Sequence, residues 1–398
     1  MSEPLQQVPL RPLRAAEAVA RLGSAAKAAA ALHLSVSAVS RAVQLAESQL
    51  GLPLFDRGAR GMAVTPAGQA LLLRVRRAHG HLVQGGGPVL AGRASDAMLR
   101  ALVAIADTRS ESAAGQRLGL TQAAVHQSLR QLEHAARFKL FERSQRGTRL
   151  TEAGEQLLLH SKLALAELRT GHEELAALRG TAAGRVAVGA LPMASDVLVP
   201  QALSRLFLRQ PGVQATVADG TYEALLHQLR HGDVDLVVGP LRGSQSPGDI
   251  HEEQLFVDRL VPVLRSGHPL LARGGKPRSL RTLQAWPWIG PLPGTPAQAA
   301  FERAFVGAGL AVPQVGLQAN SPAVVRSVLM GGDQIALLSA LQVQGELRSG
   351  LLAVLPVPLK GTERPIGVMR RRDGLPSPVL LSLLEELRAV ARDATRGS

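Results

Sequence analysis

Small polar side chains and one arginine recur at helical spacing early in the chain. Four of them share one face of a helical period: Ser37, Ser40, Arg41 and Gln44. Apolar Val39, Val43 and Leu50 fall on the other face, and Ser35 begins the run. Hydroxyl, amide and guanidinium groups on a free helix face bind phosphate oxygens and base edges in a DNA groove. The pattern therefore indicates recognition of nucleic acid.

A second basic feature follows this helix. Residues 51–65 read GLPLFDRGARGMAVT, a hairpin-like pattern with Arg57 and Arg60 beside Gly58 and Gly61 at its tip. An arginine pair on a glycine-rich turn is able to reach phosphates or the minor groove next to a recognition helix. The alternative is a solvated hairpin with ordinary surface arginines.

Two further helices are predicted to position the polar one. Residues 12–22 are apolar at close to a 3.6-residue period, and Gly23 ends that helix. Ser24 then caps an alanine-rich helix, and Ser35 begins the third. Three short helices with a polar and basic third helix predict a helix-turn-helix, whose last helix lies in a major groove.

The whole pattern occurs twice. Residues 35–68 recur at 121–154, and the offset of 86 residues holds without a gap over residues 13–73 of the first copy. The candidate DNA contacts in the second copy are Thr121, Gln122, His126, Gln127, Arg130, Arg143, Arg146 and Arg149. Either both copies contact DNA, or one copy serves mainly as a packing or dimerisation element.

Residues 13–68 resemble the winged helix-turn-helix of LysR-type transcriptional regulators. The matching positions are Ala38, Val39, Ser40, Arg41, Glu47, Leu50, Gly51, Leu54, Phe55, Arg57, Arg60, Thr65, Ala67 and Gly68. Val36 departs from the family pattern, which usually has a glutamine there, whereas the second copy keeps Gln122. The resemblance implies a protein that binds double-stranded DNA through a duplicated module.

Two helical segments join these modules to the rest of the chain. The helix that begins at Pro66 is predicted to end where it meets Gly80 and the run from Gly85 to Pro88. From Glu152 a heptad seam is formed by Leu157, Ser161, Ala164, Leu168, Gly171, Leu175 and Leu178. It resembles the family's linker helix, which pairs antiparallel between subunits, so the resemblance implies a homodimer or homotetramer. The alternative is a helix that packs on its own domain.

From residue 184 the chain alternates short apolar strands with helical segments. This pattern predicts parallel strands with crossover helices, arranged as two α/β lobes. It resembles the LysR effector domain, which is itself similar to periplasmic binding proteins. The predicted domains are 1–80 and 96–154 (winged helix-turn-helix modules), 81–95 (connector), 155–180 (linker helix) and 184–398 (effector domain). Lobe one comprises about 184–260 and 363–398, and lobe two about 261–362.

The resemblance implies a small-molecule effector in the cleft between these lobes. The predicted pocket residues, taken from loops at strand ends, are Pro192, Met193, Ala194, Ser195, Gly220, Thr221, Tyr222, Gly294, Thr295, Asn320 and Ser321. Helix N-termini at these loops favour a carboxylate or other small anion, although no cleft arginine is evident. Trp286 and Trp288 are interpreted as core of lobe two, with stacking on a ligand as the alternative.

Composition supports these interpretations. The net charge is +14, and residues 1–180 hold 23 Lys and Arg against 14 Asp and Glu. Arginine-rich codon usage is the alternative explanation for the basic excess. The chain has no cysteine, no N-terminal apolar targeting segment and no apolar run long enough to cross a membrane, so we expect a cytoplasmic location and no membrane partner.

Motifs of common enzyme classes are absent from the sequence. It has no phosphate-binding loop, no GxGxxG after a strand, no HExxH and no GxSxG, and we expect no cofactor and no metal. The functional hypothesis is an effector-responsive, sequence-specific transcriptional regulator that binds DNA, with RNA polymerase as a further candidate partner. The alternative is a small-molecule-binding or scaffolding protein whose degenerate helix-turn-helix modules mediate oligomerisation.

Overall fold

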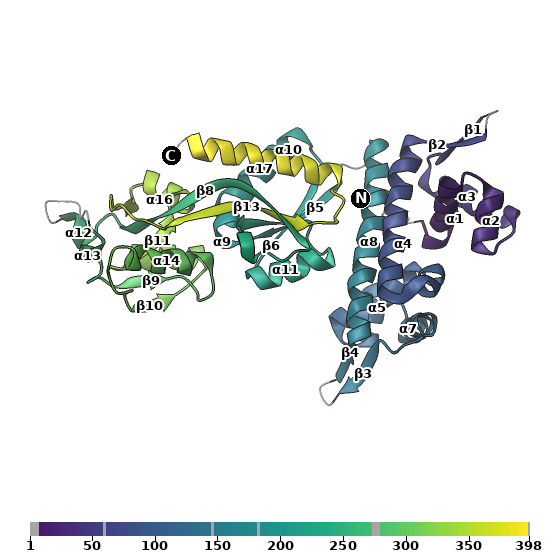
Figure 1. Ribbon diagram of the computed structural model, residues 1–398, viewed down its shortest axis with the longest axis horizontal. Helices are drawn as coiled ribbons and strands as arrows, with labels where there is room; N and C mark the ends of the chain where they lie inside the picture. Colours follow the sequence, from purple (N-terminus) through teal and green to yellow (C-terminus); the bar gives the residue numbers. More distant parts are fainter. Residues whose placement is uncertain (1–7, 59–60, 145–146, 181–183, 273–278, 397–398) are drawn as a thin grey trace. The chain divides into compact units, whose positions relative to one another are not determined.

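The computed structural model describes residues 8–58, 61–144, 147–180, 184–272 and 279–396. It divides into two compact units (Figure 1). Unit 1 comprises residues 1–185 and 230–233, and unit 2 comprises residues 186–229 and 234–398. Within the described residues no helix has the length and apolar character needed to cross a membrane.

Unit 1 contains two similar arrangements of three helices and a two-stranded antiparallel sheet. The first comprises α1 (Leu10–Leu22), α2 (Ala25–Leu32), α3 (Val36–Leu50), β1 (Phe55–Gly58) and β2 (Gly61–Val64). The second comprises α5 (Asp96–Thr108), α6 (Glu111–Leu118), α7 (Gln122–Ala136), β3 (Phe141–Ser144) and β4 (Gly147–Leu150). Each is followed by a long helix, α4 (Pro66–Arg93) or α8 (Glu152–Leu178).

Capping side chains set the starts of these helices. Ser35 Oγ accepts a hydrogen bond from Ala38 N–H at 3.2 Å. Thr121 Oγ1 accepts one from Ala124 N–H at the same distance. Gly51 ends α3 with φ 64°, a left-handed conformation that glycine adopts at little cost. The helix boundaries therefore follow from local chemistry that the sequence already contained.

The repeated Thr-x-x-Gly at the start of α4 and α8 has a structural origin. Thr65 Oγ1 accepts from Gly68 N–H at 3.0 Å, as Thr151 does from Gly154 at 3.0 Å. A Cβ atom on Gly68 would overlap the Leu54 carbonyl oxygen, and one on Gly154 would overlap the equivalent oxygen of Leu140. Only glycine permits this close approach between the first turn of the long helix and the segment before the hairpin. These motif glycines are therefore explained by packing within each module.

The prediction that α4 ends at Gly80 is wrong, whereas the break predicted at the run from Gly85 to Pro88 is confirmed. Gly87 has non-helical angles, φ 80° and ψ 171°, Pro88 follows it, and a second helical segment then continues to Arg93. Gly80 is exposed and remains helical because the apolar face around it, including Ala78 and Leu82, is buried. The proposed connector of residues 81–95 is thus mostly helix, and the glycine-rich run produces a kink.

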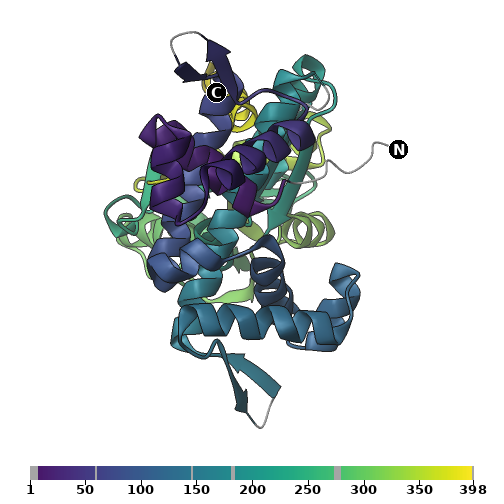
Figure 2. The ribbon, with the colours of Figure 1, turned by 90° about the vertical axis from the view of Figure 1, so that its right-hand side faces the viewer.

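The heptad seam of α8 is occupied by α4 of the same chain. Leu157, Ala164 and Leu175 are buried, and α4 and α8 lie side by side in both ribbon views (Figures 1 and 2). Leu178, the last predicted seam position, is instead 63% exposed. The expectation that this seam joins two subunits is corrected by this packing, because the intrachain helix already covers it.

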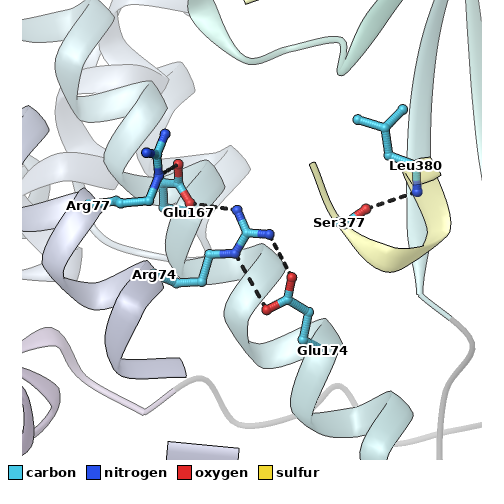
Figure 3. Close-up of polar contacts among 6 residues, drawn as sticks. All are labelled: Arg74, Arg77, Glu167, Glu174, Ser377 and Leu380. Carbon is cyan, nitrogen blue, oxygen red and sulfur yellow. Dashed lines mark hydrogen bonds and ion pairs between the residues drawn. The ribbon is translucent and has the colours of Figure 1, made fainter. Parts of the chain in front are cut away.

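Buried charges cross this helix pair. Arg74, whose side chain is 3% exposed, binds Glu167 at 2.9 Å and Glu174 at 2.6 Å (Figure 3). Arg77 binds the other oxygen of Glu167 at 2.7 Å. Burial alone would lower the pKa of Arg74, but hydrogen bonds from its guanidinium to Glu174 and Glu167 raise that pKa above its ordinary value.

Unit 2 is built on a mixed nine-stranded sheet. The path of neighbouring strands is β10-β9-β11-β8-β13-β7-β5-β6, and β12 pairs with β8. The strands are β5 (Arg185–Ala190), β6 (Gln214–Asp219), β7 (Leu236–Pro240), β8 (Ile250–Arg265), β9 (Trp288–Gly290), β10 (Val315–Gln318), β11 (Ile335–Ser339), β12 (Leu352–Val354) and β13 (Glu363–Arg371). Parallel pairs occur at β5/β7 and at β9 with β10 and β11, and the long antiparallel strands β8 and β13 connect these two groups.

Helices cover the strands of both groups. They are α9 (Pro192–Asp196), α10 (Leu198–Arg209), α11 (Tyr222–His231), α12 (Pro269–Ala272), α13 (Leu280–Leu283), α14 (Pro296–Val306), α15 (Pro322–Gly331), α16 (Gln344–Arg348) and α17 (Pro378–Arg396), with short 3-10 turns at Gly243–Gln245 and Ala340–Val343. Leu380 N–H donates to Ser377 Oγ at 3.1 Å and so caps α17 (Figure 3). Trp288 is buried edge-on against Phe301 and Phe305, which confirms its assignment to the core.

Acid is predicted to weaken unit 1 through His172. Its Nε2 accepts from Val8 N–H at 3.2 Å while Nδ1 contacts the Leu168 carbonyl oxygen at 2.7 Å, so the ring is neutral. Burial lowers the pKa of His172, whereas the unfolded side chain titrates at about 6.5. The unfolded state therefore takes up a proton first, and stability is lost as pH falls below that value.

The measurement is urea unfolding followed by far-UV circular dichroism at pH 7.5 and 5.5. His172→Gln keeps an acceptor but does not titrate, so its loss of stability between the two pH values should be smaller than that of the unsubstituted chain. An equal pH response in both proteins would contradict the assignment.

Candidate functional site

The polar face of α3 is free. Ser35, Ser37, Arg41 and Gln44 are exposed, and Ser40 is half-buried. Arg41 has no ion pair or hydrogen bond within the described parts of the chain. Val36 is 49% exposed at the first turn, so it offers an apolar surface where the second repeat has Gln122. This face offers hydrogen-bond donors to a partner while the opposite face fills the core.

The polar face of α7 is free as well. Its exposed residues are Thr121, Gln122, His126, Gln127 and Arg130. His126 Nδ1 lies 3.1 Å from Glu111, which holds the ring at the surface. A shallow hollow beside α7 is lined by the cations Arg11, Arg93, Arg130, Arg137 and Lys139, with Glu133 as its acidic residue. Such a positive concave surface attracts a polyanion.

The two hairpins are less completely described. The side chains of Arg57 and Arg143, which stand in β1 and β3, and the whole of Arg60 and Arg146 lie outside the described residues. Arg149 in β4 is exposed. The backbone pairing of Gly58 with Gly61 defines the hairpin predicted from the glycine spacing.

Glutamate side chains attach each hairpin to the helix before it. Glu47 Oε1 accepts from the backbone N–H groups of Leu54 and Phe55 at 2.9 and 3.1 Å. Glu133 accepts from Leu140 N–H at 2.9 Å in the second repeat. The glutamate of the motif therefore positions the hairpin and is not itself a contact with a ligand.

Unit 2 contains a cavity of about 410 Å³ between its two groups of parallel strands. Eight predicted pocket residues line it: Pro192, Met193, Gly220, Thr221, Tyr222, Gly294, Thr295 and Asn320. Three others do not. Ala194 is buried in the core, Ser195 Oγ donates to the Pro192 carbonyl oxygen, and Ser321 Oγ caps α15. Their short side chains serve the local backbone, which strand-end position alone did not reveal.

The expectation of a cleft without arginine is wrong. Arg242, Arg326 and Arg364 all line the cavity. Arg326 is bound by Asp196 and Glu346, both at 3.3 Å. Arg364 forms a buried two-bond pair with Asp258 at 2.8 and 2.9 Å. These two cations are therefore already neutralised by carboxylates.

Arg242 differs from the other two arginines. Its guanidinium carbon lies 4.2 Å from the centre of the Tyr222 ring, and Nη1 donates to the Gly294 carbonyl oxygen at 3.3 Å. Its Nε is buried without a hydrogen-bond partner among the described residues, and no carboxylate there forms an ion pair with its side chain. Arg242 follows β7, another parallel strand end, so the rule that located the other loops would have found it.

The described residues contain no group of three metal-binding side chains. The exposed helix faces in unit 1 carry hydroxyl, amide and guanidinium groups, whereas the cavity of unit 2 has the size and the largely apolar lining of a small-molecule site. Among the residues described at these sites, no nucleophile is paired with a base.

Comparison with known proteins identifies the family. The family model for bacterial regulatory helix-turn-helix proteins of the LysR family matches residues 10–69 and again 97–155. The model for the LysR substrate-binding domain matches residues 179–392. The chain belongs to the LysR family of transcriptional regulators: it is a DNA-binding regulator with a C-terminal α/β effector-binding domain, and it is not an enzyme.

Individual relatives agree with this assignment. The chain is 35% identical to the HTH-type transcriptional regulator GalR of Pseudomonas putida strain KT2440 over 389 residues, which covers 96% of this chain and 97% of that protein. It is 31% identical to the regulator PcaQ of Agrobacterium fabrum, over 75% of this chain and 96% of PcaQ. A quarter of this chain thus lies outside the alignment with PcaQ.

Solved structures show the same fold. The LysR family regulator CbnR matches with a TM-score of 0.54 at 20% identity, over 74% of this chain and 98% of CbnR. A full-length OxyR variant from Pseudomonas aeruginosa matches with a TM-score of 0.55 at 20% identity, over 74% of this chain and 94% of that protein.

The buried pair between β8 and β13 is predicted to stabilise the effector domain strongly. Asp258→Ala leaves Arg364 buried without its carboxylate, which should lower the free energy of unfolding by about 3–5 kcal/mol. The adjacent exposed pair of Arg259 and Glu363 offers a matched control, because Glu363→Ala should cost less than about 1 kcal/mol.

Tryptophan fluorescence in a urea titration measures the effect, because both tryptophans of the chain, Trp286 and Trp288, stand in unit 2. If both variants lowered the free energy of unfolding by the same amount, burial would not make the Asp258 pair more stabilising than the exposed pair.

Proposed function

We propose that both repeats contact double-stranded DNA and that a small carboxylate bound beside Arg242 controls this contact. The observation that carries the first part is the free polar face on both α3 and α7, each opposite a buried apolar face. The core of an interface between subunits is depleted of charged residues, whereas these faces carry hydroxyl, amide and guanidinium groups. Their chemistry therefore favours DNA contact by both modules over the alternative of degenerate modules that mediate oligomerisation.

The chemistry of these faces suits base and phosphate contacts. Arginine donates two hydrogen bonds to guanine, and glutamine pairs with adenine in the major groove. Arg41 of α3 and Gln127 of α7 occupy equivalent positions, 86 residues apart. The hairpin arginines, including Arg149, would reach the backbone or minor groove beside them.

The effector proposal rests on Arg242, whose guanidinium forms no ion pair with a carboxylate among the described residues. A carboxylate in the cavity would accept hydrogen bonds from it, and the Tyr222 ring would remain stacked on the other face. The N-terminal turns of α11, α14 and α15 all contribute lining residues, so their free N–H groups would add donors for an anion. Leu191, Ile289 and Val325 supply an apolar wall for the rest of the molecule.

Regulation would follow from closure of the cavity. The cavity is lined by residues from both strand groups. A bound molecule therefore favours the distance between the two lobes at which it contacts both of them.

We infer a two-lobed domain of residues 184–398 resembling periplasmic binding proteins, a cytoplasmic homodimer or homotetramer, and contact with RNA polymerase at promoters. For the two DNA modules and the linker helix we propose the domain limits predicted from the sequence, with the connector of residues 81–95 replaced by the extension of α4 to Arg93.

Loss of a recognition-helix cation that contacts a phosphate should weaken DNA binding and make that binding less sensitive to salt. Arg130→Ala should reduce affinity for a selected site and lower the salt slope by about 1, because one phosphate contact is lost. Arg21→Ala, an exposed arginine on α1 paired with Glu17, serves as the control. Fluorescence anisotropy from 50 to 300 mM salt, with a random duplex alongside, measures both values.

Equal affinity for selected and random duplexes would refute sequence-specific binding. An unchanged slope for Arg130→Ala, with Arg21→Ala also unchanged, would remove Arg130 from the interface.

Arg242 should determine binding of a carboxylate. In calorimetric titrations with benzoate, phenylacetate and hexanoate, at least one acid should bind more tightly than its uncharged amide. Arg242→Ala should lower the affinity for that acid by roughly 10–100-fold, the range expected for loss of a charged hydrogen-bonded contact worth about 1.5–3 kcal/mol.

Arg259→Ala removes an exposed arginine of the same domain and should leave the affinity unchanged. Equal binding of acid and amide, or unaltered binding to Arg242→Ala, would exclude the proposed role of the guanidinium.

A further inference from the structure

The two long helices of unit 1 are equivalent parts of the two repeats and pack antiparallel. Along α4 the residue numbers rise while those of their partners on α8 fall. A Cβ on Gly171 would contact Leu71 at 2.9 Å, Arg74 binds Glu167, and a Cβ on Gly85 would contact His160 at 2.7 Å. The sheets β1/β2 and β3/β4 lie at opposite ends of this helix pair (Figures 1 and 2).

Adding or subtracting the offset of 86 residues converts each of these contacts into another contact of the same helix pair. Arg74 corresponds to His160, and Glu167 corresponds to His81. The Arg74–Glu167 contact thus has an equivalent in His81 and His160, whose ring centroids lie 6.1 Å apart. Each contact from α4 to α8 therefore has an equivalent contact from α8 to α4. Such reciprocal contacts indicate a twofold axis between the two helices.

Two more pairs obey the same rule. Gly171 approaches Arg74, and its equivalent Gly85 approaches the equivalent residue, His160. Leu10 N–H donates to Asp96 at 2.7 Å, and these residues are themselves one offset apart. Equivalent residues meet each other only close to a twofold axis. Unit 1 is therefore a pseudo-dimer formed by one chain.

The charges of the helix pair explain why it forms within the chain. Arg74 of α4 faces Glu167 and Glu174 of α8. Two copies of α4 paired in this geometry would put Arg74 opposite His81, without a carboxylate. Two copies of α8 would put Glu167 opposite His160, without an arginine. Buried charges that lose their partners are strongly destabilising, so pairing of α4 with α8 is favoured.

Recognition helices related by a twofold axis match the symmetry of duplex DNA, in which two half-sites are read by two equivalent helices. We propose that a single chain forms a complete two-headed DNA reader for a bipartite site with two unlike half-sites. The inference rests on the proposed contact of both repeats with DNA. It goes further by assigning one half-site to α3 and the other to α7 of the same chain.

The half-sites differ because the two helices present different groups at equivalent positions. Val36, Ser40, Arg41 and Gln44 of α3 correspond to Gln122, His126, Gln127 and Arg130 of α7. All of the latter are exposed, and Arg41 and Gln44 are exposed on α3. An arginine and a glutamine at the same place favour guanine and adenine respectively, so a palindrome would satisfy only one head.

The test begins with selection of duplexes from a random pool by the full chain, followed by hydroxyl-radical footprinting. The selected site should have two segments of unlike sequence. Arg41→Ala should weaken protection of one segment by roughly 10–100-fold, and Gln127→Ala should do the same to the other segment only. Arg21→Ala should leave both segments unchanged.

The outcomes separate this inference from the proposed function. If Arg41→Ala weakens both segments equally, two chains each use α3, and the single-chain reader is overturned although DNA binding stands. If Gln127→Ala changes neither segment, α7 reads no half-site and the inference is overturned. If selection yields no preferred sequence, the proposed function itself fails. All three substitutions alter exposed side chains, so folding is preserved in each case.

Discussion

The contact of Arg74 with Glu167 and Glu174 is the interaction on which the arrangement of unit 1 depends. It lies between α4 and α8, the helices that carry the two repeats, and its atoms are nearly excluded from water. A charge at this depth is tolerated only with a partner of opposite sign. This contact therefore stabilises the pair of α4 with α8 and disfavours other pairings. Because α4 and α8 follow the two modules directly, their pairing also determines the relative positions of the two recognition helices.

A comparable constraint acts in unit 2. The strands β8 and β13 belong to both strand groups, and the buried pair of Asp258 and Arg364 crosses between them. Ser339 Oγ donates to the same aspartate at 2.6 Å, which extends the network to β11. The cavity beside this network is also lined by Arg242, whose guanidinium forms no ion pair within the described parts of the chain.

The sequence revealed the repeat, the helix order and most of the cavity loops, because these depend on local chemistry. The helix caps Ser35 and Thr121 bond to backbone groups a few residues away. The glycine required in the first turn of α4 and of α8 is also explained by its nearby motif. The partner of the α8 seam could not be found this way, since periodicity identifies a buried face but does not say which helix buries it. Gly80 was misjudged because packing outweighed its low helix propensity. Arg242, which the predicted site did not include, lies just past the end of β7, a parallel strand end like those that carry the predicted loops.

In the proposed complex, one chain contacts both half-sites of its DNA. This is measured most directly by a stoichiometric titration of full-length protein, at concentrations far above the dissociation constant, against a duplex that carries one selected bipartite site. Binding should saturate at one duplex per chain, whether or not chains associate with one another. Saturation at one duplex per two chains would show that each chain supplies a single head, and would contradict the account.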